Sequence, residues 1–409
     1  MKILALNSGS SSQKTSLYEI GETLPEHPPQ PLWDAKVEWG NDSADLEIRK
    51  PGIAVFRGRM KIESRRRAIE QLIKRLWEDK ASAVVNLSEI DIVGHRIVHG
   101  GPRFEKPTFV TPEVKEAIAG VSAFAPLHNR AELEGIEIIE GLLGGVPQVA
   151  VFDTGFHHGL PLAAAVYPGP YDWFERGIRR YGFHGISHQY CAQRAAQLLD
   201  RDLTSLKIVT CHLGNGCSLA AIDGGRSVDT TMGFSPLEGL MMGTRSGSVD
   251  PGILTYLMRQ EQVSGQQLDD LLNLNSGLLG ISGVSSDMRQ ILAAIKEGNE
   301  RAKLAFEIFV HRLQSGIGAM VAVLGGVHAL VFTAGIGENS AEVRSAACTR
   351  LRFLGLKIDS RRNGDSPVDQ DVACPDSGVR VLVVRTQEDW AVARACWEST
   401  RLSGVKAAI

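Results

Sequence analysis

The sequence predicts an α/β protein made of two similar halves with an active-site cleft between them. Apolar strand patterns alternate with amphipathic helical patterns along the 409 residues, and this alternation is typical of α/β folds. A hairpin of the form strand, polar or Gly-rich turn, strand occurs at the N-terminus and again in the second half of the chain. The repetition indicates a duplicated fold.

Composition narrows the class of protein. Hydrophobic residues make up 43% of the chain, and at roughly 100–200 residues per domain two or three domains are expected. The net charge of −3 weighs against a general nucleic-acid binder. The first apolar run is too short for a signal peptide, and no run is long enough to predict a membrane span. Six cysteines without a C-x-x-C pair indicate reduced thiols in a cytoplasmic protein.

The first hairpin is predicted from two apolar runs. Lys2–Leu6 and Thr15–Ile20 read as strands, and the polar segment Asn7–Ser12 separates them. Residues 21–50 are rich in Pro, Glu and Asp. We expect them to form a surface excursion, and their sequence indicates no particular function.

The second hairpin repeats this design. Lys207–His212 and Ser218–Asp223 are the strands, and Leu213–Gly216 is the turn. A third Gly-rich turn is predicted at Ala334–Asn339, after the strand Ala329–Thr333. Ser340 is a good N-cap for a helix that follows it.

Two later helices have clear patterns. One is predicted from about 299 to 324, with His311 structural or exposed and with an apolar stripe made of Phe306, Phe309, Val310, Leu313, Ile317, Met320 and Leu324. The last helix, Glu388–Arg401, follows a strand at Val381–Val384.

The Gly-rich turns favour polyphosphate binding. The chain contains no G-x-x-x-x-G-K-[ST] motif and no G-x-G-x-x-G after its first strand, which argues against P-loop and Rossmann enzymes. Successive backbone N–H groups in turns form anion-binding concavities, and a following helix N-terminus also favours negative charge. Three such turns, each after an apolar strand, predict a polyphosphate site.

Two arginines stand in unusual surroundings. Arg96 lies in Gly94–Gly101 and Arg245 lies in Gly243–Gly247, both among small or apolar residues. A surface arginine rarely has such neighbours. Because a guanidinium suits phosphoryl oxygens and planar carboxylates, both are candidates for an active site.

Carboxylates and histidines complete the local signals. Asp153 and Glu388 each follow a buried strand, where a carboxylate either caps the next segment or holds Mg²⁺. His95/His99 and His184/His188 have i, i+4 spacing but no H-E-x-x-H motif, so a zinc site is disfavoured. A histidine that donates to a phosphoryl oxygen fits better.

With these motifs in place, the chain resembles the acetokinase family, within the superfamily of acetate and sugar kinases, heat-shock chaperones and actin. The matching segments follow the family's order nearly end to end. They are Asn7–Ser12 with Lys14, Gly94–Gly101, Ala125–Asn129, Val151–Thr154, Tyr181–Gly185 with Ser187 and His188, His212–Gly216, Met232–Gly247, Asp250 and Pro251, Ser276 and Gly277 with Gly280, and Phe332–Asn339.

The resemblance implies a fold and a reaction. The fold would be two duplicated actin-like, ribonuclease H-like domains, an N-terminal one (1–152 plus 389–409) and a nucleotide-binding one (153–388). The reaction would be reversible transfer of a phosphoryl group from ATP to acetate, giving acetyl phosphate and ADP. It would need Mg²⁺, or Mn²⁺ in its place. The resemblance also implies a cytoplasmic homodimer without nucleic-acid or membrane partners.

The resemblance further implies roles for individual residues. Arg96, Asp153, His184 and Arg245 would be catalytic, with Arg96 also binding substrate, and Asn7 and Glu388 would position the metal. A methyl pocket would consist of Val98, Leu127, Phe183 and Pro236. The nucleotide would meet Lys14, His212, Gly214, Asn215, Gly216, Asp287, Arg289, Gly335, Ile336 and Asn339, while His128 and His212 would support the cleft. Gln13 and Gln387 depart from the family's usual residues and leave strand packing and magnesium geometry open.

Three alternatives remain at this stage. The nearest is a kinase for propionate or butyrate with the same machinery. A nucleotide-switched binding protein, like chaperones or actin, is the alternative from another class, and the arginine pair argues against it. A sugar kinase would need a polar cluster for a polyol, which the sequence does not offer.

Overall fold

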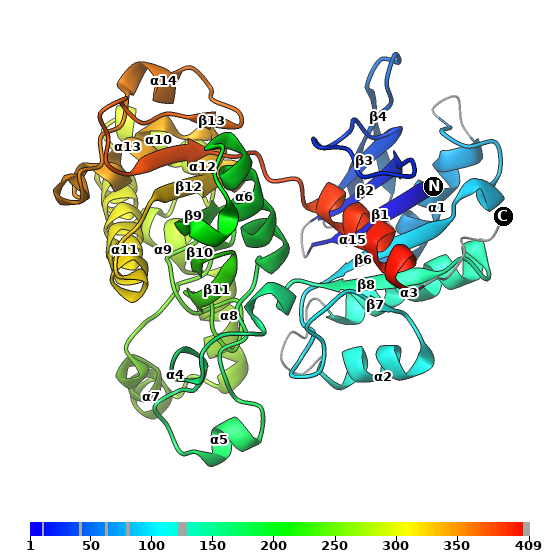
Figure 1. The fold of residues 1–409 in the computed structure, drawn as a ribbon. Helices are drawn as coiled ribbons and strands as arrows, with labels where there is room; N and C mark the ends of the chain where they lie inside the picture. The colour runs from blue at the N-terminus through cyan, green and yellow to red at the C-terminus, as the bar shows by residue number, and fades with distance from the viewer. Residues whose placement is uncertain (10–11, 41–42, 62–63, 79–81, 122–128, 404–409) are drawn as a thin grey trace. The chain divides into compact units, whose positions relative to one another are not determined.

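The computed structural model describes residues 1–409 except 10–11, 41–42, 62–63, 79–81, 122–128 and 404–409 (Figure 1). The chain forms two compact units. Unit 1 comprises 1–155 with 387–409, and unit 2 comprises 156–386. The domain boundaries expected at 152/153 and 388/389 remain a prediction. In the observed grouping, Asp153 and Glu388 both belong to unit 1.

Unit 1 is built on one mixed sheet with the strand order β5-β4-β3-β2-β1-β6-β8-β7. β1 pairs antiparallel with β2 and parallel with β6, and β6 pairs parallel with β8. The predicted first hairpin is therefore confirmed. The strands are β1 (Lys2–Ser8), β2 (Ser12–Glu19), β3 (Trp33–Trp39), β4 (Ser43–Arg49), β5 (Phe56–Lys61), β6 (Ile92–Ile97), β7 (Thr108–Phe109) and β8 (Gln148–Phe152).

The prediction of a surface excursion over residues 21–50 is wrong for 33–39 and 43–49, which form strands. β3 and β4 extend the sheet antiparallel to β2. Trp33 is fully buried, and Ala35 and Val37 follow it on the same face. This strict alternation of buried and polar positions is the mark of a half-buried strand, and the abundance of Pro and acidic residues obscured it.

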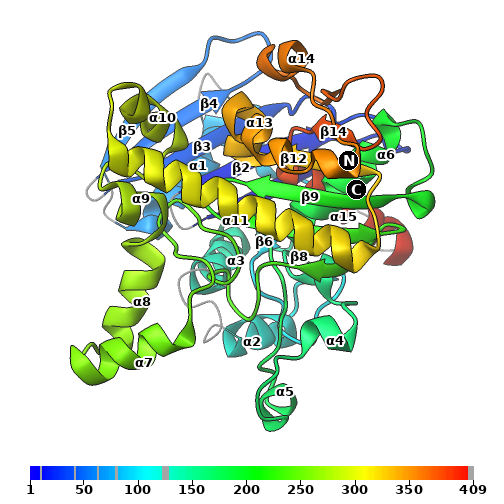
Figure 2. The ribbon, with the colours of Figure 1, turned by 90° about the vertical axis from the view of Figure 1, so that its left-hand side faces the viewer.

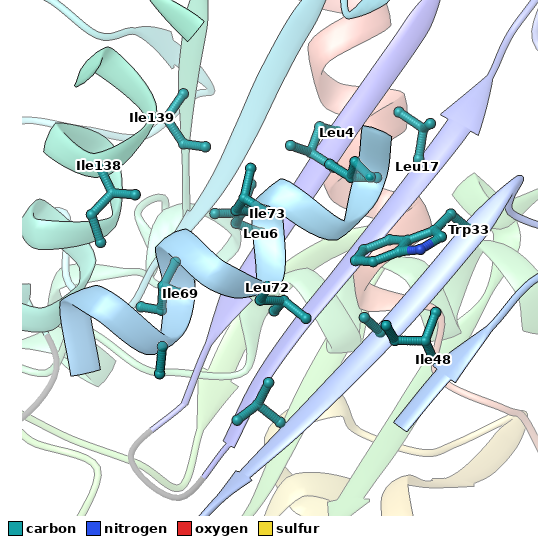
Figure 3. Packing of buried hydrophobic residues seen from close by; sticks show 14 of the residues in the cluster. Leu4, Leu6, Leu17, Trp33, Ile48, Ile69, Leu72, Ile73, Ile138 and Ile139 are labelled. Carbon is teal, nitrogen blue, oxygen red and sulfur yellow. The ribbon is translucent and has the colours of Figure 1, made fainter. Parts of the chain in front are cut away.

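Helices cover both faces of the unit 1 sheet. α1 (Arg65–Glu78) packs with α3 (Asn129–Leu143), and Figure 3 shows its apolar face over Trp33, Leu4 and Leu6. α15 (Glu388–Ser403) lies against β1, β2 and β6. A short helix, α2 (Pro112–Gly120), packs beside α3. Because side chains alternate along β1, Leu4 and Leu6 face α1 while Asn7 faces the start of α15.

Unit 2 has a second mixed sheet with the order β11-β10-β9-β12-β14-β13. β9 pairs antiparallel with β10 and parallel with β12, and β12 pairs parallel with β14. The second predicted hairpin is thus confirmed as well. The strands are β9 (Lys207–Leu213), β10 (Cys217–Asp223), β11 (Arg226–Thr230), β12 (Ala329–Thr333), β13 (Gln370–Asp371) and β14 (Arg380–Val383).

The predicted long helix is α11 (Glu300–Leu324), capped by Asn299 and crossing the unit 2 sheet (Figure 2). All of its predicted stripe is buried except Phe306, which is half-buried, and His311 is exposed. The other helices of this unit are α4 (Leu162–Ala165), α5 (Asp172–Glu175), α6 (Gly185–Leu198), α7 (Pro251–Gln260), α8 (Gly265–Leu274), α9 (Gly277–Ser282), α10 (Met288–Lys296), α12 (Ala334–Asn339), α13 (Ala341–Thr349) and α14 (Ser360–Gly364).

The third predicted Gly-rich turn is wrong in its secondary structure. Ala334–Asn339 forms the short helix α12, which starts directly at the end of β12. Ala334 makes the sharp entry with φ 63°. Ser340 does cap the next helix, α13, as predicted, by accepting a hydrogen bond from the Val343 N–H.

The two units repeat one sheet design. The order β3-β2-β1-β6-β8 in unit 1 matches β11-β10-β9-β12-β14 in unit 2, with the same strand directions. This is the duplicated α/β fold that the sequence predicts. Across the described ranges, no helix has the length and apolar character needed to cross a membrane.

Candidate active site

Arg96 and Asp153 form a buried ion pair in unit 1. Arg96 lies on β6 and Asp153 follows β8, its parallel neighbour, so both emerge near one edge of the sheet. Arg96 Nη2 donates to Asp153 Oδ2 at 2.8 Å, and the side chains are 11% and 1% exposed. Asp153 therefore forms an ion pair with Arg96. The local sequence indicated only a capping role or Mg²⁺ binding for this carboxylate.

The charge on Arg96 is stabilised by its neighbours. Burial on its own lowers the pKa of the Arg96 guanidinium, but the charges of Asp153 and Glu388, together with the hydrogen bond to Asp153, outweigh burial and raise it. Arg96 is thus held as a cation inside the protein.

Asn7 and Glu388 meet where β1 faces the start of α15. Asn7 Nδ2 donates to Glu388 Oε2 at 3.1 Å and to Asp389 Oδ1 at 3.2 Å. The amide and carboxylate oxygens gathered here are the hard donors that Mg²⁺ prefers. Among the described residues no cluster of three or more His, Cys, Asp or Glu could hold a metal. The donors that are present, the Asn7 amide and the Glu388 carboxylate, fit an Mg²⁺ that takes one or two protein ligands and completes its shell with phosphates and water.

Glu132 is a functional candidate that sequence reasoning missed. It lies on α3, is 2% exposed, and accepts a hydrogen bond from the Val98 N–H at 2.9 Å. Burial raises the pKa of Glu132 to about 8, although Arg96 and the Val98 N–H pull it down. A detectable signal existed, because Glu132 shares the buried stripe of its helix with Ile136 and Ile139.

The residues predicted for the methyl pocket belong to different units. Val98, in unit 1, is 4% exposed, and Phe183, in unit 2, is 1% exposed. Pro236 is half-buried, and its carbonyl accepts a hydrogen bond from Arg245 Nη1 at 3.1 Å. Leu127 and His128 lie outside the described residues, as do Ser10 and Ser11 of the first turn.

In unit 2, predicted residues gather around the turn between β9 and β10. A Cβ added at Gly216 would lie 3.3 Å from His184 Cε1 and 3.4 Å from Arg245 Nη1. A Cβ at Gly243 would lie 2.2 Å from Asn215 Oδ1. The backbone at Gly216 therefore lies close to His184 and Arg245, and a side chain at position 243 would require Asn215 to move.

Arg245 carries a positive charge with little compensation. It is half-buried, and its Nη1 donates to the Pro236 carbonyl at 3.1 Å and lies 4.0 Å from Met242 Sδ. Within the part of the chain that the structure describes, no carboxylate lies within ion-pair distance of it. Burial lowers the pKa of Arg245, with the Cys217 thiol opposing. A half-buried cation of this kind suits an anionic ligand.

His184 and His212 stack beside the same turn, with ring centroids 4.0 Å apart. His184 is the N-cap residue of α6 and has φ 56°, a left-handed conformation that is uncommon outside glycine. His212 Nδ1 lies 2.8 Å from Ser187 Oγ. His95 is different, because it lies 2.6 Å from Gln148 Oε1 and burial lowers its pKa to about 4. His95 is a core residue.

The residues predicted to bind adenosine form hydrogen bonds and ion pairs with residues near them in the sequence. Asp287 caps α10 and pairs with the exposed Arg289 at 2.5 Å. On α12, Asn339 Nδ2 donates to the Gly335 carbonyl at 2.9 Å. Asn339 also lines a cavity of about 360 Å³ within unit 2, along with Glu338 and Arg385.

Glu338 is a second residue that the sequence interpretation missed. Its Oε1 accepts hydrogen bonds from the N–H groups of Ala334 at 2.9 Å and Thr386 at 3.0 Å. It therefore ties the start of α12 to the segment that leads toward Glu388. Burial raises the pKa of this carboxyl, and these N–H groups oppose the rise.

Comparison with known proteins shows the family to which the chain belongs. The model of the acetokinase family matches residues 2–394. The chain belongs to the acetokinase family. It is 58% identical over 400 residues to the acetate kinase of Cyanothece sp., covering 97% of this chain and 98% of that protein. It is 57% identical over 407 residues to the acetate kinase of Gloeobacter violaceus, covering 98% and 100%.

Solved structures of the family have the same fold. The acetate kinase of Porphyromonas gingivalis superposes with a TM-score of 0.88 at 42% identity, covering 97% of this chain and 99% of that one. A propionate kinase from Francisella tularensis gives 0.87 at 37% identity, covering 96% and 98%. These neighbours support the duplicated actin-like fold and a kinase that phosphorylates a carboxylate.

Proposed function

We propose that this protein transfers the γ-phosphoryl group of ATP reversibly to acetate, giving acetyl phosphate and ADP. The observation that carries the proposal is Arg245, a half-buried cation without a carboxylate partner in the described chain, beside His184 and the Gly214–Gly216 turn. Membership of the acetokinase family and relatives named acetate kinase support acetate as the acceptor.

The reaction does not require covalent catalysis by a side chain of the protein. A carboxylate is already a nucleophile near neutral pH, so no general base is required to activate it. Catalysis then depends on orienting the acceptor and on stabilising charge around the phosphoryl group. Bound Mg²⁺, or Mn²⁺, would neutralise charge on the phosphates.

We assign each charged group one task. Arg96 and Arg245 hold the acceptor carboxylate and the phosphoryl oxygens, while Asp153 fixes the direction of the Arg96 guanidinium through its 2.8 Å ion pair. His184 donates a hydrogen bond to the phosphoryl group. Asn7 and Glu388 supply oxygen atoms for the metal.

The nucleotide assignments depend on family resemblance and on backbone geometry. Gly214, Asn215 and Gly216 present their turn to the phosphates, with His212 beside them. Asp287, Arg289, Gly335, Ile336 and Asn339 surround the adenosine in this proposal, and Lys14, exposed on β2, approaches the phosphates.

Propionate is the second candidate acceptor, because a structural neighbour at 37% identity is a propionate kinase. Val98, Phe183 and Pro236, with Leu127, are the proposed walls that exclude longer acids. The higher identity to proteins named acetate kinase favours acetate.

The test is hydroxylamine trapping of the acyl phosphate. Purified protein is incubated with ATP, Mg²⁺ and acetate, propionate or butyrate in turn, and the hydroxamate is measured. We expect the largest kcat/KM for acetate. Absence of hydroxamate with all three acids would overturn the proposal, and a preference for propionate or butyrate would overturn only the acetate assignment.

We also propose that the protein works as a cytoplasmic homodimer. α7 has no buried residue, and Ile253, Tyr256 and Met258 on it are 49%, 59% and 50% exposed. α7 lies at the end of unit 2 away from β12 and β14 (Figures 1 and 2). Ile253 and Tyr256 lie one turn apart on the same side of α7, and exposed apolar side chains of this kind are suited to a contact with a second copy of the chain.

A further inference from the structure

A chain of hydrogen bonds leads from the core of unit 2 to His184. Thr210 Oγ1 lies 2.6 Å from His188 Nδ1, and His188 Nε2 lies 2.7 Å from Ser218 Oγ. Ser218 Oγ then lies 2.8 Å from His184 Nδ1. Thr210, His188 and Ser218 are completely buried. The proposed roles of the active-site residues do not involve these three.

Two arrangements of protons give the Ser218 hydroxyl proton an acceptor within this hydrogen-bond chain, and a third, in which Ser218 accepts from both histidines, is unfavourable because it leaves that buried proton without an acceptor among the described residues. Burial lowers the pKa of His188 well below its usual value, with His157 and His212 adding to the effect, so the ring is neutral and has one N–H. A serine hydroxyl also has one proton. If His188 Nε2 donates to Ser218, Ser218 donates to His184 Nδ1; if His188 carries its proton on Nδ1, every donor and acceptor is reversed.

Thr210 decides between the two arrangements. The only hydrogen bond that the described residues offer its side chain is the one to His188. When His188 Nδ1 is unprotonated, Thr210 donates to it, and the hydroxyl protons of both Thr210 and Ser218 then have an acceptor. In the reverse arrangement the Thr210 hydroxyl proton is buried without an acceptor, which is unfavourable.

We propose that Thr210, His188 and Ser218 are positioning residues that hold His184 as the tautomer with its proton on Nε2. The Nε2 edge faces the Gly-rich turn, since a Cβ at Gly216 would lie 3.4 Å from His184 Nε2. This tautomer presents an N–H to a phosphoryl oxygen, whereas the other presents a lone pair to an anion. The catalytic consequence rests on the proposed function; the tautomer itself does not.

The conformation of His184 agrees with this constraint. Although His184 is the N-cap residue of α6, its side chain makes no capping hydrogen bond. The ring is instead bonded to Ser218 and stacked on His212. Residues in the left-handed region persist where surrounding contacts over-determine them.

The direct test is nitrogen NMR of the full chain labelled with ¹⁵N-histidine near neutral pH. His184→Gln identifies the His184 pair of signals by their loss. We expect Nδ1 to be of the pyridine type and Nε2 to be of the pyrrole type in the wild-type protein. A pyrrole-type Nδ1 at His184 overturns the proposal, and this measurement requires no core variant to fold.

Variants of Ser218 test the functional consequence. Ser218→Ala should lower kcat by roughly 10- to 100-fold, the effect typical of losing a group that orients an active-site histidine, and lower kcat/KM in parallel. Ser218→Thr keeps the hydroxyl and should restore most of kcat. Ser227→Ala is the matched control, because Ser227 makes a similar buried bond, 2.7 Å, to His157 Nδ1. It should leave the His184 signals unchanged.

The outcomes separate the two proposals. Full kcat in folded Ser218→Ala would overturn the positioning role even if hydroxylamine trapping succeeds. Failure of acyl phosphate formation in the wild type would overturn the proposed function, while an Nε2 proton on His184 would still support the assignment of the tautomer.

Discussion

Arg96 and Arg245 are the residues on which the proposed chemistry depends, and their surroundings differ. Arg96 is paired with Asp153 and lies near further carboxylates, so its charge is largely balanced before any ligand binds. Arg245 contacts a carbonyl and a sulfur atom instead. An anion should therefore gain more from Arg245, while Arg96 is the better-oriented group.

We expect Arg96→Ala and Arg245→Ala each to lower kcat by about 10³-fold or more, the scale of an arginine that acts on a phosphoryl transition state. Steady-state kinetics on folded variants measures this. Arg380→Ala is the control, because Arg380 is also partly buried and paired with an aspartate, at 2.5 Å, but is not among the predicted site residues. Losses below about tenfold in both site variants would contradict the assignment.

Glu132 should make stability depend on pH. Its pKa is raised to about 8 by burial, from 4.5, so the folded state holds a proton that the unfolded state releases. Its contribution is fully present below pH 4.5 and is lost as pH rises through 8. Arg96, Asp153 and Arg65 are the charged groups that act on it. Glu132→Gln should flatten this slope by up to about 1.4 kcal/mol per pH unit.

The measurement is denaturant unfolding of Glu132→Gln and wild type between pH 5 and pH 9. Glu137→Gln serves as the control, since Glu137 is exposed on the same helix. Parallel curves for wild type and Glu132→Gln would show that Glu132 is ionised in the folded protein throughout this range.

Val98→Ala should widen the acceptor range. It removes two methyl groups from a proposed wall, and an apolar pocket distinguishes one methylene by about 1–3 kcal/mol. The ratio of kcat/KM for propionate to that for acetate should rise. Val93→Ala, a buried change in the core cluster on β6, the strand that directly precedes Val98, is the control. An unchanged ratio in Val98→Ala would mean that Val98 does not line the pocket.

At the scale of elements, strand ends and helix starts position the site. Asn7 is near the end of β1, Asp153 follows β8, and the Gly214–Gly216 turn follows β9. α12 begins directly at the end of β12, and its Glu338 binds the Thr386 N–H. Regular elements thus hold the backbone rigidly, while short connections present the polar groups.

Glu388 occupies the first turn of α15, where a carboxylate also stabilises the helix dipole. We expect the main effect of Glu388→Ala to be on metal use: the Mg²⁺ concentration needed for half-maximal activity should rise clearly, and the melting temperature should fall only slightly. A magnesium titration and a thermal melt on the same preparation compare the two effects. Glu398→Ala removes a less buried carboxylate from the same helix and controls for general effects on α15. An unchanged titration with reduced stability would favour a purely capping role.

At the scale of the whole molecule, the chain repeats one sheet design in both units. Each unit supplies part of the proposed chemistry: Asn7, Arg96 and Asp153 come from unit 1, and His184 and Arg245 come from unit 2. The proposed reaction therefore requires both units, and we expect neither to be active alone.

Self-association tests the exposed face of α7. Tyr256→Glu places a charge at a position that is 59% exposed beside other apolar side chains, and a charge inside an apolar interface is unfavourable. Sedimentation velocity should show a dimer for wild type and a shift toward monomer for the variant. Arg361→Glu, on α14, is the control for a change of charge at an exposed position. A monomeric wild type, or an unaffected Tyr256→Glu dimer, would contradict the homodimer.

The sequence alone determined the α/β class, the two hairpins, the long helix and most candidate residues, because strand and helix periodicity and Gly-rich turns are local properties. It failed for β3 and β4, where composition obscured the alternation, and for α12, where glycines suggested a turn. Only the tertiary structure decided which polar groups meet. The Arg96–Asp153 pair, the burial of Glu132 and the Thr210–His188–Ser218–His184 chain join residues far apart in sequence. Their partners and pKa values depend on packing, which no local pattern contains.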